Sequence, residues 1–194
     1  MNRARTFLLP LLCGLLAAPT FIVLHECGHF LAGKSLGWSA TLHYAESQFA
    51  GPQEALTQRR ELWMSCAGPL MSTLLAASGF LWLRASRIRR LQSIPTFTDW
   101  VATTLIMNAG RWLRCLAGSP SDPLPDDEAW ISRAIGLPGW LLPYSLGAIA
   151  IAVLIATVRL HPPKSRFMPF LCLGVGGALG SLLWMELVGP ALLP

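Results

Sequence analysis

The chain has 194 residues, of which 53% are hydrophobic and only 13% are charged. This composition is too apolar for an ordinary soluble domain and is typical of a multi-pass membrane protein. The net charge of +5 comes from short basic clusters between apolar runs, which is how membrane proteins mark their cytosolic loops, so no nucleic-acid partner is expected. We therefore expect one domain over residues 1–194, integral to a lipid bilayer such as a bacterial cell membrane.

The first apolar segment extends from about Phe7 to Ala32. Its start resembles a signal peptide, but the apolar run continues for the length of a membrane span, so we expect it to remain uncleaved. Proline inside a helix removes a hydrogen bond, so Pro19 should kink this helix or begin a new one. Gly33 is the expected end of the helix, with Gly37 close behind it.

A His-Glu-x-x-His motif lies at the end of this segment, formed by His25, Glu26 and His29. Residues four apart share one face of a helix, so both imidazoles can bind the same ion. Neutral imidazole suits Zn²⁺, and the glutamate beside the first ligand is placed to act as a base rather than as a ligand. The motif predicts a zinc site with His25 and His29 as ligands and Glu26 as the catalytic base.

The stretch from Trp38 to Gln53 is too polar to cross a membrane and too short to form a domain. Its first part alternates loosely and is rich in residues that favour strands, and Gly51 with Pro52 indicates a turn. We expect a short hairpin or a re-entrant loop beside the metal, with a plain surface loop as the alternative. His43 and Tyr44 are then candidates for substrate binding.

Four further apolar segments follow, over about 62–83, 100–116, 140–158 and 167–188. We expect Gly68 and Pro69 to break the first of these, and Asn108, at the middle of the second, to take part in substrate binding because a polar residue at membrane depth needs a partner. Gly176 and Gly180 form a G-x-x-x-G pair, which favours close helix packing and allows a helix-mediated oligomer. The predicted fold is an all-α bundle of about five transmembrane spans. Three basic clusters indicate which ends of the spans face the cytosol, and they place the amino terminus on the cytosolic side. The residues of these clusters are Arg3, Arg5, Arg84, Arg87, Arg89, Arg90, Arg159, Lys164 and Arg166.

An acidic stretch over 118–128 is the best source of a third zinc ligand. Catalytic zinc takes three protein ligands and keeps one position open, so two histidines are not sufficient. Asp126 or Asp127 can also cap a helix over 128–135. The candidates for the third ligand are Asp127, Asp126, Asp122 and His43.

A His-Glu-x-x-His motif on a membrane helix, followed much later by an aspartate at a helix start, resembles the site-2 protease family of intramembrane metalloproteases. The second motif of that family ends in Leu-Asp-Gly, and its aspartate is the third zinc ligand. The run from Pro125 to Ile131 can be aligned with it so that Asp127 takes the ligand position and Glu128 replaces the glycine. The resemblance implies an intramembrane zinc protease that cleaves membrane proteins or peptides. The alternative is a non-proteolytic zinc-binding scaffold or transporter of the membrane.

Overall fold

The computed structural model describes residues 3–51, 57–89, 95–116, 118–119, 121, 126–163 and 166–194. Within these ranges the protein is an all-α bundle with one small hairpin. Four helical segments are long and apolar enough to cross a membrane: α1 (Arg3–Ser35), α2 (Gln58–Arg89), α6 (Leu141–Leu160), and α7 (Phe167–Leu183) together with its helical continuation to Leu192. The shorter elements are β1 (Ser39–Leu42), β2 (Ser47–Ala50), α3 (Phe97–Ile106), the 3₁₀ helix η2 (Met107–Gly110), α4 (Arg111–Cys115), α5 (Asp127–Ala134), the π-helix η4 (Trp184–Val188) and α8 (Gly189–Leu192).

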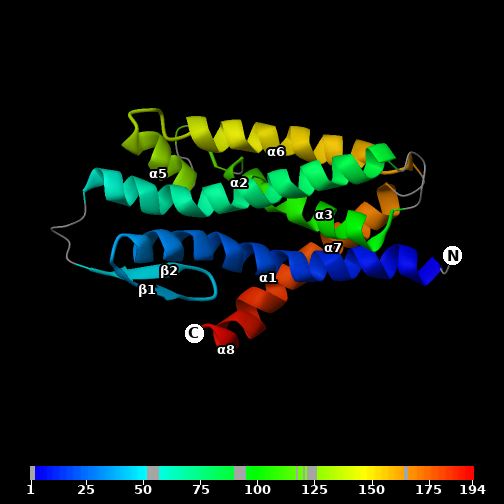
Figure 1. Cartoon of the computed structure of the whole chain (residues 1–194), viewed down its shortest axis with the longest axis horizontal. Coiled ribbons are helices and arrows are strands. Elements are labelled where there is room, and N and C mark those ends of the chain that lie inside the picture. Colours follow the sequence, from blue (N-terminus) through cyan, green and yellow to red (C-terminus); the bar gives the residue numbers. More distant parts are fainter. Residues whose placement is uncertain are drawn as a thin grey trace.

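The long helices give the molecule two distinct ends. The start of α1 lies at the same end of the molecule as the carboxyl ends of α2 and α6, whereas the hairpin and α5 lie at the opposite end (Figure 1). Large apolar side chains are exposed along the outer faces of these helices, among them Leu74, Leu81, Ile149 and Leu171. Lipid solvates such side chains as well as a protein interior does, so these faces suit a bilayer.

The helix α1 is continuous through Pro19, so no new helix begins there. It also ends later than predicted, at Ser35, because Gly33 still belongs to the helix. Gly37 has a φ of 79° and ends it: the N–H of Gly37 donates to the Lys34 carbonyl, and that of Trp38 to the Gly33 carbonyl. This is the Schellman arrangement, which glycine adopts without a steric penalty.

The helix α2 is likewise continuous through Gly68 and Pro69, where a break was expected. A proline removes only one backbone hydrogen bond, and packing on both sides of a membrane helix can maintain the rest. The prediction was wrong because it considered the backbone alone. Gly68 is required instead because the side chains of His25 and His29 pack against it.

The third expected span, over 100–116, is broken into α3, η2 and α4. The 3₁₀ turn contains Asn108 and Gly110, and the Asn108 side-chain amide donates to the Leu105 carbonyl at 2.9 Å. A side chain that bonds to the backbone in this way competes with regular helix. This segment brings the chain from the end of α2 towards α5. Among the described residues, four helical segments rather than five are therefore long and apolar enough to cross a membrane.

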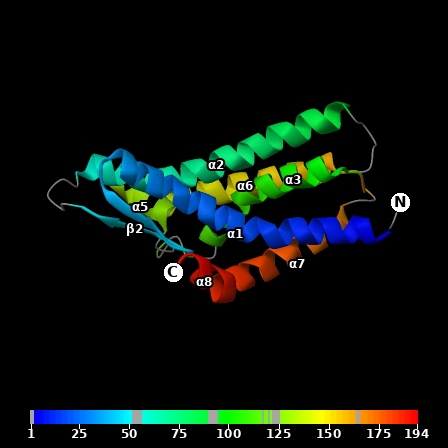
Figure 2. The same cartoon turned by 60° about the horizontal axis from the view of Figure 1, so that its bottom comes forward.

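The expected hairpin is present. Strands β1 and β2 are antiparallel, with Ala40 paired to Phe49 and Leu42 to Ser47. The hairpin lies along the second half of α1 (Figure 2), and the Ser47 hydroxyl donates to the Glu26 carbonyl at 2.8 Å. The hairpin therefore sits against the helix turn that contains the histidine motif.

The closest helix packing joins α1 to α7 through three glycines. A Cβ atom at Gly14 would lie 2.1 Å from the Leu173 carbonyl oxygen, and one at Gly176 or Gly180 would lie 2.2 Å from a carbonyl oxygen of α1. The atoms in the way are backbone and cannot move aside. The Gly176–Gly180 pair thus packs within the chain, and a helix-mediated oligomer stays a prediction.

Replacing Gly176 by alanine is expected to lower the free energy of unfolding by about 1–3 kcal/mol, the usual cost of overpacking. Unfolding by sodium dodecyl sulfate in mixed micelles, followed by circular dichroism, measures this change. Gly174→Ala is the matched control, because a Cβ at Gly174 has nothing within 4 Å. Equal stability of the two variants would contradict the packing described here.

Candidate metal centre

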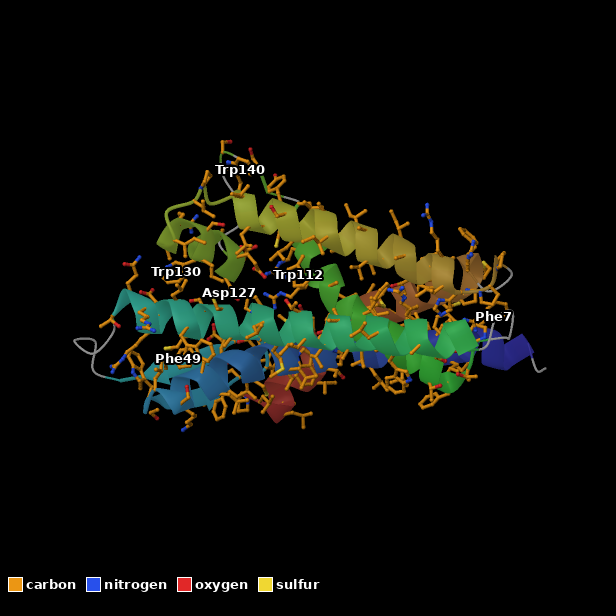
Figure 3. The ribbon with its side chains drawn as sticks, turned by 45° about the horizontal axis from the view of Figure 1, so that its top comes forward. Phe7, Phe49, Trp112, Asp127, Trp130 and Trp140 are labelled. Atoms are coloured by element: carbon orange, nitrogen blue, oxygen red, sulfur yellow. The ribbon has the colours of Figure 1, made fainter. Side chains whose placement is uncertain are left out.

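His25 and His29 lie one turn apart on α1, and both side chains are buried. Their Nε2 atoms are 3.0 Å apart. Asp127, the first residue of α5, lies opposite them, with its Oδ2 atom 3.1 Å from Nε2 of His25 and 3.2 Å from Nε2 of His29. Figure 3 shows Asp127 on the side of α5 that faces α2. Three donor atoms from two distant parts of the chain therefore converge on one point.

The opposite ring nitrogens of both histidines are held by α2. Nδ1 of His29 lies 2.7 Å from the Met64 carbonyl oxygen, and Nδ1 of His25 lies 3.1 Å from the Ser72 hydroxyl. A carbonyl only accepts, so Nδ1 of His29 donates, and the neutral ring carries its lone pair on Nε2. Ser72 can accept from His25 in the same way. Such outer hydrogen bonds fix the orientation of metal-binding histidines.

The donor set fits a zinc ion. Two lone pairs and a carboxylate oxygen lie 3.0–3.2 Å apart, and they repel one another unless a cation lies between them. Ligands at zinc–nitrogen distances of 2.0–2.1 Å in a tetrahedral site are separated by about 3.3 Å. The separations in the protein are close to this value. Two imidazoles with one carboxylate leave a fourth position open, as catalytic zinc sites do.

Gly68 of α2 provides the space in which the imidazoles meet. A Cβ at this position would lie 2.2 Å from Nε2 of His29 and 2.6 Å from Nε2 of His25. Gly28 has a related role, since a Cβ there would lie 2.5 Å from the Ala67 carbonyl oxygen and would separate α1 from α2. Both glycines keep the histidine face of α1 close to α2.

Gly68→Ala is expected to lower zinc content by displacing both imidazoles while the helices stay folded. Metal analysis of the purified protein, together with circular dichroism, measures both effects. Gly174→Ala again serves as the control. Full zinc content in Gly68→Ala would show that the ion binds elsewhere.

Glu26 lines a cavity of about 610 Å³ together with the three donor residues. The hairpin contributes Ser47 and Phe49, alternate residues of β2. The other residues lining this cavity, which we call the cleft, are Trp38, Glu46, Glu61, Met64, Ser65, Arg111, Arg114 and Asp126. The Glu26 carboxylate, the three metal donors and strand β2 thus line the same cavity.

Arg111, the first residue of α4, supplies a positive charge to the cleft. Its Nη2 atom lies 3.8 Å from Oδ2 of Asp127, and its Nε atom 4.0 Å from Oε1 of Glu128. This guanidinium favours the ionised form of the Asp127 side chain. Asp127 is therefore a carboxylate, as a zinc ligand must be.

The other candidates for the third ligand do not complete the donor group of the two histidines among the described residues. Asp126 caps α5, its Oδ1 accepting from the Ala129 N–H at 2.9 Å, so the helix cap and the donor that meets the histidines are separate residues. Nδ1 of His43 faces the carbonyl of Pro194. Asp122 lies outside the described residues. Within the described part of the chain, the donor group that contains both histidines is completed by Asp127.

The three predicted substrate-binding residues are not among those that line the cleft. The Tyr44 N–H donates to the Leu193 carbonyl, and Nε1 of Trp184 donates to the Tyr44 carbonyl, so the hairpin tip packs on η4 and on the end of α8. Asn108 is buried, and its Oδ1 has no hydrogen-bond partner among the described residues. The cleft is lined instead by Trp38 and β2, the second strand of the hairpin.

Comparison of the chain with protein-family models, with curated proteins and with solved structures finds no match.

Proposed function

We propose that the protein is an intramembrane zinc metalloprotease that hydrolyses peptide bonds of membrane-associated substrates, similar to the site-2 proteases. The observation that supports this proposal is the meeting of His25, His29 and Asp127 in a cleft that is also lined by Glu26, which is not one of these three donors. Zinc proteases combine these two elements, an ion with an open position and a base beside it.

Each residue of the cleft has a distinct task. His25, His29 and Asp127 hold the ion, which when bound supplies Lewis-acid chemistry towards water and a carbonyl group. Glu26 accepts a proton from the attacking water and delivers it to the leaving amine. Arg111 balances the negative charge of Asp127.

A substrate must reach the cleft as an extended chain, because a helix hides its backbone in its own hydrogen bonds. Strand β2 lines the cleft, and an unwound substrate segment can be held there by strand addition. Trp38 and Phe49 offer apolar contacts to its side chains.

Zinc removal provides the test. The chain, purified in detergent, is incubated with a mixture of single-span membrane peptides, and the products are identified by mass spectrometry. Cleavage is expected to stop after treatment with a zinc chelator and to return when Zn²⁺ is restored. Cleavage that continues without metal, or stoichiometric zinc with no cleavage of any peptide, would contradict a protease and favour the scaffold or transporter.

A further inference from the structure

A second group of metal-binding side chains lies beside the first and shares no residue with it. It consists of Cys115, Asp126 and Glu128, whose donor atoms all lie within 4.8 Å of one another. The Cys115 thiol donates to Oδ2 of Asp126 at 3.1 Å. Cys115 and Glu128 are buried, and Asp126 reaches the cleft, so an ion has a route to the group.

The two groups use different residues of the first turn of α5, and the side chains of these residues contact different helices. Asp127 points at α1, whereas Glu128 points at α4, where its Oε1 accepts from Nε1 of Trp112 at 3.1 Å. Asp126 uses its Oδ1 to cap α5, which leaves Oδ2 for the cysteine.

Glu128 gives independent evidence for a ligand. Its side chain is fully buried, and its second oxygen, Oε2, has no hydrogen-bond partner in the described part of the chain. A buried carboxylate oxygen without a partner is costly and calls for a cation or a proton. Oε1 already has Trp112, and Arg111 lies 4.0 Å from that same atom.

We propose that Cys115, Asp126 and Glu128 form a second site for a divalent transition-metal ion, of which Zn²⁺ is the best match. A thiolate ligand selects zinc and similar ions over Mg²⁺ and Ca²⁺, and three protein ligands with one water complete a tetrahedral site. On binding, the Cys115 thiol loses its proton to solvent, and the ion takes the place of that proton between Sγ and Oδ2.

The ion would link two elements of the fold. Cys115 is the last residue of α4, and Asp126 is the residue that caps α5. An ion bound by both fixes the start of α5, and with it the position of Asp127 in the first site. The second site is therefore structural and acts on the first through α5.

Cobalt substitution distinguishes the two sites, because only the second contains a thiol. The full chain in detergent, loaded with Co²⁺, is expected to show a thiolate-to-cobalt charge-transfer band in the near ultraviolet. Cys115→Ser and Glu128→Gln should each remove this band and lower the bound metal from two ions per chain to one. Cys13→Ser is the matched control, since Cys13 is also a buried free thiol but belongs to neither group of metal donors among the described residues. This variant should keep the charge-transfer band and both metal ions.

The double variant His25→Ala/His29→Ala separates this proposal from the proposed protease activity. It removes the first site and leaves the second unaltered, so it should lose one ion and keep the band. Absence of the band in both the wild-type protein and this double variant would overturn the second site whether or not the chain cleaves peptides. A band that persists in Cys115→Ser would overturn it equally.

Discussion

Glu26→Gln is expected to lower peptide cleavage by at least about 100-fold while zinc content stays unchanged. General-base catalysis by a positioned side chain contributes about 100- to 10,000-fold, and an amide cannot accept the proton. Glutamine has nearly the same shape, and Glu26 is not among the three donors that converge in the structure, so the site should keep its ion. Cleavage rate and bound zinc are measured on the same preparation.

The same substitution separates the two candidate functions. A scaffold or transporter that only binds zinc through His25, His29 and Asp127 has no need of a base at position 26. Full activity of Glu26→Gln in the peptide assay would refute the protease proposal. Glu186→Gln is a suitable control, because Glu186 is exposed on η4 and does not line the cleft.

Asp127→Ala is expected to weaken zinc binding at the first site by about 100-fold or more and to abolish cleavage. Removal of a residue that merely orients a ligand costs about 10- to 100-fold in metal affinity, and loss of a direct ligand costs at least as much. Asp127→Asn should be almost as damaging, since a neutral amide is a poor zinc ligand. The measurement is zinc titration in the Cys115→Ser background, so that only one site is counted.

Asp127 was the residue least determined by the sequence, which makes this a strict test. If Asp127→Ala keeps tight zinc binding, the third ligand is one of Asp126, Asp122 and His43, and the same titration on those variants identifies it. Glu186→Gln should again bind zinc normally. Asp127→Asn preserves the size of the side chain, so its secondary structure is compared with that of Asp127→Ala. If only Asp127→Ala loses secondary structure, its loss of zinc reflects unfolding rather than loss of a ligand.

The parts of the fold that the sequence predicted correctly are those set by local chemistry. The apolar length of the segments that became α1, α2, α6 and α7 was clear, as were the strand-forming residues of the hairpin and the aspartate cap of α5. One error was the expected continuous span over 100–116, which is broken into α3, η2 and α4. The other errors concern glycine and proline. Gly33 and Gly68 were interpreted as breaks, although Gly33 lies within a helix and Gly68 makes room for two imidazoles.

The candidate site was only partly visible in the sequence for a related reason. His25, Glu26 and His29 form a local motif, whereas Ser72, the Met64 carbonyl and Gly68 contribute through the packing of α2 on α1. No spacing rule reveals such contacts. Arg111 carried a usable signal, since a charged residue within an apolar segment is costly and usually functional. Cys115 carried none, because its proximity to Asp126 and Glu128 depends on how α4 meets α5.

The length of α1 has a consequence for what a cleaved substrate becomes. His25 stands about 18 residues beyond Phe7, where the apolar part of the helix begins, so it lies about 27 Å along the axis, and the hydrocarbon layer is about 30 Å thick. Trp63 and Trp140, exposed by 49% and 38%, suit the same boundary, since tryptophan gathers at membrane surfaces. The scissile bond is thus expected near one face of the bilayer, within reach of bulk water. One product would keep almost its whole hydrophobic length and stay anchored, while the other would be released from that face.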